Sequence, residues 1–138
     1  MAYDLERFVL AQQGSYDAAL QELRDGRKTG HWIWFIFPQG QGLGRSEMSR
    51  YYALESLDEA RAYLAHPVLG PRLRECAAAM LSVPCRSAEQ ILGGIDAVKL
   101  RSSMTLFHRA APDEPLFGRV LDRFYGGMED ELTVERLG

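Results

Sequence analysis

The sequence has 138 residues, of which 46% are hydrophobic and 25% charged, and its formal net charge at pH 7 is −3. A chain of this size and composition forms one globular domain, residues 1–138, which needs no metal or disulfide to fold. The slightly acidic balance excludes a general electrostatic attraction to nucleic acid or to an anionic membrane, and we expect neither as a partner.

Three features of the sequence predict a cytoplasmic protein. The two cysteines, Cys76 and Cys85, form no CxxC pair and no disulfide framework. The first residues include charged side chains, which a secretion signal would not have there. The longest apolar run, Trp32 to Phe37, has six residues, whereas a membrane span needs about 18.

Apolar residues recur at helical spacing along most of the chain and predict an all-α domain of about six to eight short helices. No strand alternation recurs, and no repeat or linker interrupts the pattern. The first expected helix lies near residues 5–12, the next begins after Ser15, which is expected to cap it, and a helix over 47–54 follows Ser46. The later ones lie at 57–65, 71–81, 88–92, 96–110 and 115–124.

The expected helix ends carry recognisable start and stop signals. Capping boxes are expected at Ser56 with Glu59 and at Ser87 with Gln90, and Asp96 is expected to cap the 96–110 helix. Proline in the first turn is expected at positions 71 and 115. Glycines at 14, 26, 93, 94, 126 and 127 are expected to end helices.

Residues 31–46 contain an aromatic block followed by a glycine-rich loop. The block, residues 32–37, fits a buried helix or an extended segment, and we expect Pro38 to stop it. Such a block is more often core than ligand platform. Each indole N–H needs a partner, however, so at least one of Trp32 and Trp34 is expected to edge a cavity or the surface.

The loop carries glycine at positions 40, 42 and 44, followed by Arg45 and Ser46. Alternate glycines let backbone N–H groups approach a ligand, and a capped helix start with a guanidinium beside it favours an anion. The pattern matches neither a Walker loop nor a dinucleotide-binding fingerprint, and an ordinary connection fits equally well.

Polar side chains on the 96–110 helix form a second group. Lys99, Ser102 and Ser103 share one helix face, where they could contact a polar ligand or simply be solvated. His31 could act as an acid, a base or a phosphate donor, or could be a surface residue. The three histidines are scattered without metal-ligand spacing, so we expect no metal, and nothing predicts a cofactor.

Four blocks of the sequence resemble a bacterial family called domain of unknown function 1810, and they are His31–Gln39, Gly42–Ser46, Tyr63–Leu73 and Lys99–Phe107. The resemblance covers nearly the whole chain and implies a mainly helical fold, but it implies little about activity. Some members carry the label calpastatin. That kind of inhibitor is a long disordered chain, whereas this composition specifies a packed core.

We hypothesise that segment 28–51 and the 96–107 helix form one pocket for a small anionic, nucleotide-like ligand. The second hypothesis is an enzyme, either a hydrolase or a transferase, that acts on a nucleotide-derived substrate such as ADP-ribose. The third is a protein-interaction domain. The residues expected to bind the ligand are Lys28, His31, Trp32, Trp34, Gln39, Gly42, Gly44, Arg45, Ser46, Tyr51, Lys99 and Ser102.

Overall fold

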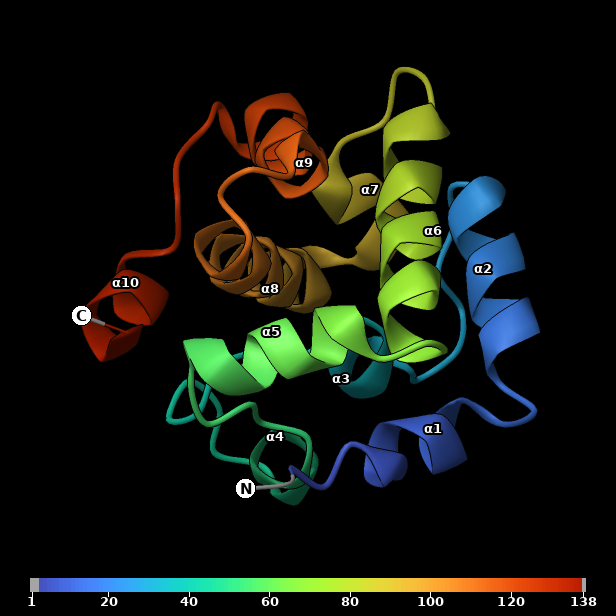
Figure 1. Ribbon diagram of the computed structural model, residues 1–138. Coiled ribbons are helices and arrows are strands. Elements are labelled where there is room, and N and C mark those ends of the chain that lie inside the picture. Colours follow the sequence, from blue (N-terminus) through green and yellow to red (C-terminus); the bar gives the residue numbers. More distant parts are fainter. Residues whose placement is uncertain (1–2, 138) are drawn as a thin grey trace.

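A computed structural model describes residues 3–137 and shows an all-α domain (Figure 1). Its helices are α1 (Glu6–Gln12), α2 (Tyr16–Arg24), α3 (Ile33–Ile36), α4 (Glu47–Tyr51), α5 (Leu57–Ala65), α6 (Leu69–Ser82), α7 (Ala88–Leu92), α8 (Gly94–Ala110), α9 (Pro115–Tyr125) and α10 (Glu131–Leu137). The longest helix, α8, contacts α5, α7, α9 and α10, while α6 contacts α2, α5 and α9.

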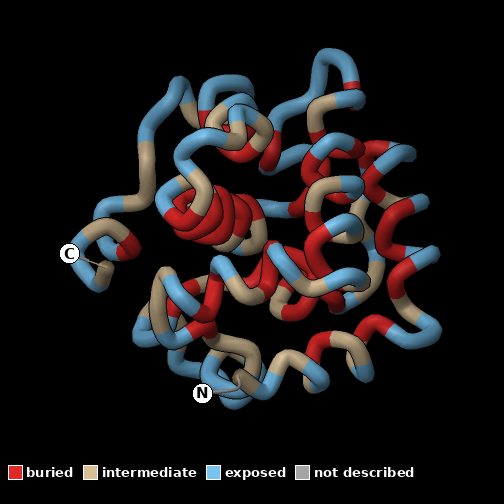
Figure 2. The backbone as a smooth tube through the Cα atoms, viewed as in Figure 1, coloured by how far each residue is buried: buried red, intermediate tan, exposed pale blue. Residues whose placement is uncertain are grey.

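The core runs between these helices, and α8 is the most continuously buried of them (Figure 2). Aromatic rings connect four helices in sequence. Phe8 of α1 packs on Tyr63 of α5 with ring centroids 5.1 Å apart, Tyr63 packs on Phe107 of α8 at 5.5 Å, and Phe107 packs on Phe117 of α9 at 5.7 Å. These four rings are nearly inaccessible to solvent, and they join the N-terminal and C-terminal halves of the chain.

Most of the predicted helix ends are confirmed. The Ser87–Gln90 capping box is complete, and the Ser46 hydroxyl accepts a hydrogen bond from the Ser49 N–H at 3.1 Å. Gly26 and Gly126 follow α2 and α9 with φ of +74° and +63°. The free thiol of Cys76 is buried as expected, and burial raises the pKa of Cys76 to about 12, so the thiol is not a reactive one.

Several local predictions are wrong. Gly94 begins α8 instead of ending the helix before it. The Ser56–Glu59 capping box is only half formed, because the Glu59 carboxylate accepts from the Glu55 N–H. Asp96 does not cap its helix, because α8 begins two residues earlier and Asp96 turns to an ion pair instead. Ser15 occupies the N-cap position of α2 but makes no capping hydrogen bond through its side chain. The helix after Ser46 ends at Tyr51 rather than at residue 54, because Leu54 pairs with the loop at Gly40.

The ambiguous segment 32–37 forms the short helix α3, with Phe37 just beyond its end and Pro38 after it. Phe35 packs against Tyr52, which follows α4, and the two ring centroids are 5.6 Å apart. Trp34 lies against α8. The apolar block therefore lies between α1 and α8 and contacts both helices.

Gly70, in the first turn of α6, allows that turn to lie close against the backbone of α5. A Cβ at this position would overlap the carbonyl oxygen of Leu64, which also accepts a hydrogen bond from Arg74 at 3.2 Å. We expect Gly70→Ala to lower the free energy of unfolding by about 1–3 kcal/mol through overpacking. Gly94→Ala is the matched control, because nothing lies within 4 Å of a Cβ there and alanine favours the helix. Equal urea midpoints for the two variants would contradict this account.

Candidate functional site

The segments 28–34 and 96–102, which the sequence singles out, lie in contact in the structure. The ammonium group of Lys28 lies 2.8 Å from Asp96, and the ammonium of Lys99 lies 3.6 Å from the same carboxylate. Lys99 also lies over the ring of Trp34, 4.8 Å from its centroid, and Lys28 lies 5.1 Å from the centroid of Trp32. We call these five residues the lysine cluster.

The backbone nest just before the aromatic block is filled by the protein's own carboxylate. One oxygen of Glu22 accepts hydrogen bonds from the N–H groups of Thr29 and Gly30, at 2.7 and 2.9 Å, and from the Trp32 indole at 2.9 Å. Burial alone would raise the pKa of Glu22, but these hydrogen bonds outweigh it and lower the pKa below its usual value. An incoming anion would therefore have to displace Glu22.

The positive charges of the lysine cluster are therefore neutralised by carboxylates of the protein itself. The side chain of Lys28 is 8% exposed and faces Asp96, and Glu22 occupies the nearby donors. Trp34 is half-buried, so part of its ring reaches the surface, but its indole N–H is buried and has no partner within residues 3–137. Ser102 is buried and donates to the Val98 carbonyl at 3.3 Å. The geometry makes this cluster a cross-link between α3 and α8, with little charge left for a ligand.

The glycine loop lies elsewhere, against the C-terminal helix α10. Gly40 forms a parallel bridge with Leu54, and the Gln41 N–H donates to the Leu54 carbonyl at 2.9 Å. Gly42 has a φ of +86°, and a Cβ there would lie 3.0 Å from the guanidinium carbon of Arg136. The loop and α10 enclose a cavity of about 280 Å³, lined by Gly40, Gln41, Gly42, Leu43, Leu54, Glu55, Thr133, Arg136 and Leu137.

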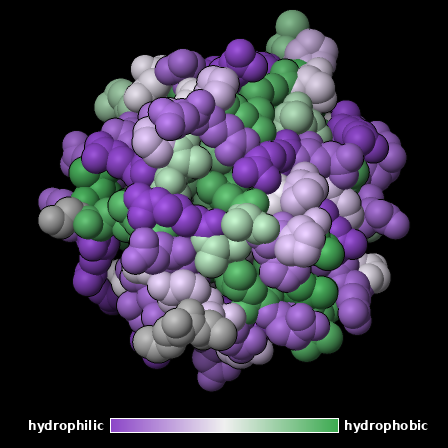
Figure 3. All heavy atoms as spheres, in the orientation of Figure 1, coloured by the Kyte–Doolittle hydropathy of each residue, from purple (hydrophilic) through white to green (hydrophobic). Residues whose placement is uncertain are grey.

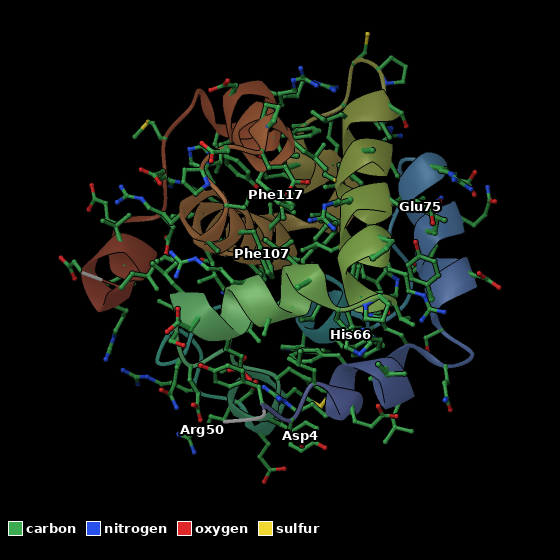
Figure 4. The ribbon with its side chains drawn as sticks, in the orientation of Figure 1. Asp4, Arg50, His66, Glu75, Phe107 and Phe117 are labelled. Carbon is green, nitrogen blue, oxygen red and sulfur yellow. The ribbon has the colours of Figure 1, made fainter. Side chains whose placement is uncertain are left out.

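A larger cavity, of about 480 Å³, adjoins the first and shares Gln41 and Glu55 with it. It lies between the start of the chain, α1 and α4, at the end of the molecule where Figure 4 shows Asp4 and Arg50. Its lining residues are Tyr3, Asp4, Arg7, Gln41, Arg50, Tyr51, Ala53, Glu55 and Glu59. We call the two cavities together the loop cavities.

A buried ion pair forms one wall of the larger cavity. The guanidinium of Arg7 lies 3.6 Å from the carboxylate of Glu59, and the two side chains are 10% and 3% exposed. Arg7 also donates to the carbonyls of Tyr51 and Ala53, both at 2.9 Å, and Glu59 accepts from the Glu55 N–H at 2.6 Å. The pair thus places fixed polar groups in the wall of the cavity, and placed polar groups are what orient a ligand in a pocket.

The predicted ligand-binding residues thus divide between two places, and their role stays a prediction. Lys28, Trp32, Trp34 and Lys99 belong to the lysine cluster, and Ser102 is buried nearby on α8. His31 and Arg45 are exposed, Ser46 caps α4, and the Gln39 carbonyl accepts from the Leu54 N–H. Only Gly42 and Tyr51 of the predicted set line the loop cavities, while Gly44 lies against Ser49.

Sequence reasoning missed the charged residues of the loop cavities. Arg7, Arg50 and Glu55 belong to no motif, and Arg7 precedes its partner Glu59 by 52 residues in the sequence. Only Glu59 carried a signal in the sequence, because it occupies the N3 position of the predicted Ser56–Glu59 capping box. In the structure its carboxylate binds the N–H of Glu55 rather than that of Ser56.

Residues 3–137 contain neither a metal-binding cluster nor a membrane-spanning helix. No group of three or more histidine, cysteine or acidic side chains there is arranged to hold a metal ion. None of the helices in this range has both the length and the apolar character needed to cross a membrane.

A solved protein has nearly the same fold. The crystal structure of the conserved hypothetical protein Rv1873 from Mycobacterium tuberculosis is 51% identical in sequence, with a TM-score of 0.96, over 98% of this chain and 96% of that one. No curated protein is significantly similar. The family model described as "Protein of unknown function (DUF1810)" matches residues 2–137. The chain therefore belongs to the DUF1810 family.

Proposed function

We propose that this protein binds a small anionic, nucleotide-like ligand in the loop cavities. The observation that carries the proposal is the position of Arg50, which is exposed and lines the 480 Å³ cavity together with the Arg7–Glu59 pair. Among residues 3–137, Arg50 forms no ion pair with a side chain. An unpaired guanidinium at a cavity favours phosphate or carboxylate, which it can bind with two parallel hydrogen bonds.

Other features of the loop cavities favour a nucleotide-like shape. Tyr51 is 58% exposed, so its ring can stack on a flat group. The carboxylates of Asp4 and Glu55 can accept hydrogen bonds from sugar hydroxyls or an exocyclic amine. A volume of about 480 Å³ lies within the usual range of small-molecule sites. Lys28 and Lys99 are not part of the proposed site, because Asp96 pairs with both.

Turnover of such a ligand is the second candidate function. Glu55 and Glu59 place two carboxylates in the same cavity, and carboxylates can serve as general acids or bases. On the face shown in Figure 3, hydrophilic and hydrophobic areas alternate, so this face does not favour a wide apolar docking surface.

The test is a thermal-shift screen of nucleotides, dinucleotides and sugar phosphates, followed by calorimetric titration of each compound that raises Tm. We expect Arg50→Gln to weaken binding at least about tenfold, because a charge-assisted hydrogen bond contributes about 1.5–3 kcal/mol. Tyr51→Ala tests stacking, and Arg119→Gln is the matched control on the exposed side of α9. Incubation of the same compounds with the protein, followed by product analysis, distinguishes turnover from binding.

The proposal fails if no compound in the screen raises Tm. It also fails if a compound binds Arg50→Gln and Arg119→Gln with the same affinity as the original protein.

A further inference from the structure

Each of the two loop cavities contains an arginine without an acidic partner. Arg136 of α10 lines the cavity of about 280 Å³, and Arg50 lines the cavity of about 480 Å³. Both residues are exposed, and neither forms an ion pair with another residue in the range 3–137. Arg136 reaches the site because α10 lies beside the glycine loop at one edge of the molecule (Figure 1). The proposed site therefore has one uncompensated positive charge in each of its two parts.

The guanidinium of Arg136, and not only its carbon stem, lies beside the smaller cavity. A Cβ at Gly42 would lie 3.0 Å from the guanidinium carbon and 3.2 Å from Nε and from Nη1. Gly42 lines the same cavity, and its φ of +86° also favours glycine. The N–H groups of Gly42 and Leu43 donate to no backbone carbonyl within residues 3–137, so they are available to bind an anion together with Arg136.

Two polar residues stand where the cavities adjoin, because Gln41 and Glu55 line both of them. The carboxylate of Glu55 accepts hydrogen bonds and repels an anion, so it favours a neutral group that carries hydroxyls at this point. The amide of Gln41 both donates and accepts, and it suits the same kind of group. The lining thus favours a negative charge in each cavity and a hydrogen-bond donor where they meet.

We infer that the ligand is a nucleoside bisphosphate, with its phosphates on two different hydroxyls of the sugar. One phosphate contacts Arg50, the other contacts Arg136, and the sugar donates its remaining hydroxyl to Glu55. A single phosphate would leave one guanidinium without an anion, and a diphosphate chain would place both charges at one end of the sugar. The inference rests on the proposed function, because it narrows the ligand of the same site.

The probes are adenosine 5′-monophosphate, adenosine 3′,5′-bisphosphate, its 2′,5′ isomer and adenosine 5′-diphosphate, each titrated calorimetrically into the full chain. We expect one of the bisphosphates to bind at least about tenfold more tightly than the monophosphate, because its second phosphate gains charge-assisted hydrogen bonds from Arg136. The diphosphate, whose two phosphates form one chain, should bind less than about threefold more tightly than the monophosphate.

The contribution of Arg136 is measured as the ratio between the affinities for the better bisphosphate and for the monophosphate. Arg136→Gln should lower this ratio to about 1, because the second phosphate loses its cation. Arg136→Lys keeps the charge without the planar fork and should retain part of the ratio. Arg119→Gln is the matched control on the exposed side of α9 and should retain all of it.

Three results would overturn the inference alone: bisphosphates that bind no more tightly than the monophosphate, an Arg136→Gln ratio equal to that of Arg119→Gln, or a diphosphate that binds as tightly as the better bisphosphate. In each case an affinity for the monophosphate that depends on Arg50 leaves the proposed function standing. If none of the four adenosine compounds binds, the inference is overturned as well, and the other compounds of the screen decide the proposed function.

Discussion

Replacing Arg7 with methionine is expected to lower the free energy of unfolding by about 3–5 kcal/mol, measured by urea unfolding. The reason is the burial of its partner. Glu59 is 2% exposed and would be left buried without a guanidinium beside it, while the carbonyls of Tyr51 and Ala53 would each lose a donor. An uncompensated buried charge is among the few mechanisms that produce a loss of this size.

Two further variants distinguish the contribution of the ion pair to stability from that of the neighbouring hydrogen bonds. Glu59→Gln keeps an oxygen that can accept from the Glu55 N–H, so we expect a smaller loss of about 1–3 kcal/mol. The double variant Arg7→Met, Glu59→Leu removes both charges and should be more stable than Arg7→Met alone. A loss below about 1 kcal/mol for Arg7→Met would mean that the pair behaves as an exposed one, and would refute this account.

Replacing Asp96 with alanine is expected to cost about 3 kcal/mol, because it leaves two cations facing each other without their shared carboxylate. Lys28 is the more affected, since its side chain is 8% exposed and its ammonium lies 2.8 Å from Asp96. Lys99 is 20% exposed and can turn toward solvent. The measurement is again the free energy of unfolding in urea.

The control for this prediction is Asp58→Ala, which removes an exposed ion pair with Arg61. Exposed pairs contribute about 0–1 kcal/mol, so the Asp58 variant should unfold almost as the original protein does. Adding Lys28→Met to Asp96→Ala should restore part of the lost stability. Equal losses for the Asp58 and Asp96 variants would show that the lysine cluster does not hold α3 against α8.

The helical fold follows from short-range patterns, and for that reason it can be predicted from the sequence. The Ser87–Gln90 box, the serine at position 46 and the glycine at position 26 each act within one turn of their helix, and each is observed. The six-residue apolar block was ambiguous because helix and strand periods cannot be distinguished over so short a length.

The candidate site was harder to predict, because its charged residues come from distant parts of the sequence. Asp96 has the local pattern of a helix cap, yet Lys28, 68 residues before it, draws its carboxylate into an ion pair. Glu59 likewise has the pattern of a capping box but binds Arg7, which precedes it by 52 residues. Asp96 therefore forms a long-range ion pair in place of the predicted cap, and Glu59 combines its ion pair with a hydrogen bond from the Glu55 N–H. The residues that line the loop cavities could therefore not be identified by spacing.

The most direct test of the central claim is a map of backbone amide shifts in NMR spectra, recorded with a compound that raises Tm in the screen. We predict that the largest shifts fall on the amides of residues 40–43 and 50–55, around the loop cavities. Largest shifts at residues 28–34 and 96–103 would instead place the ligand at the lysine cluster and contradict the account.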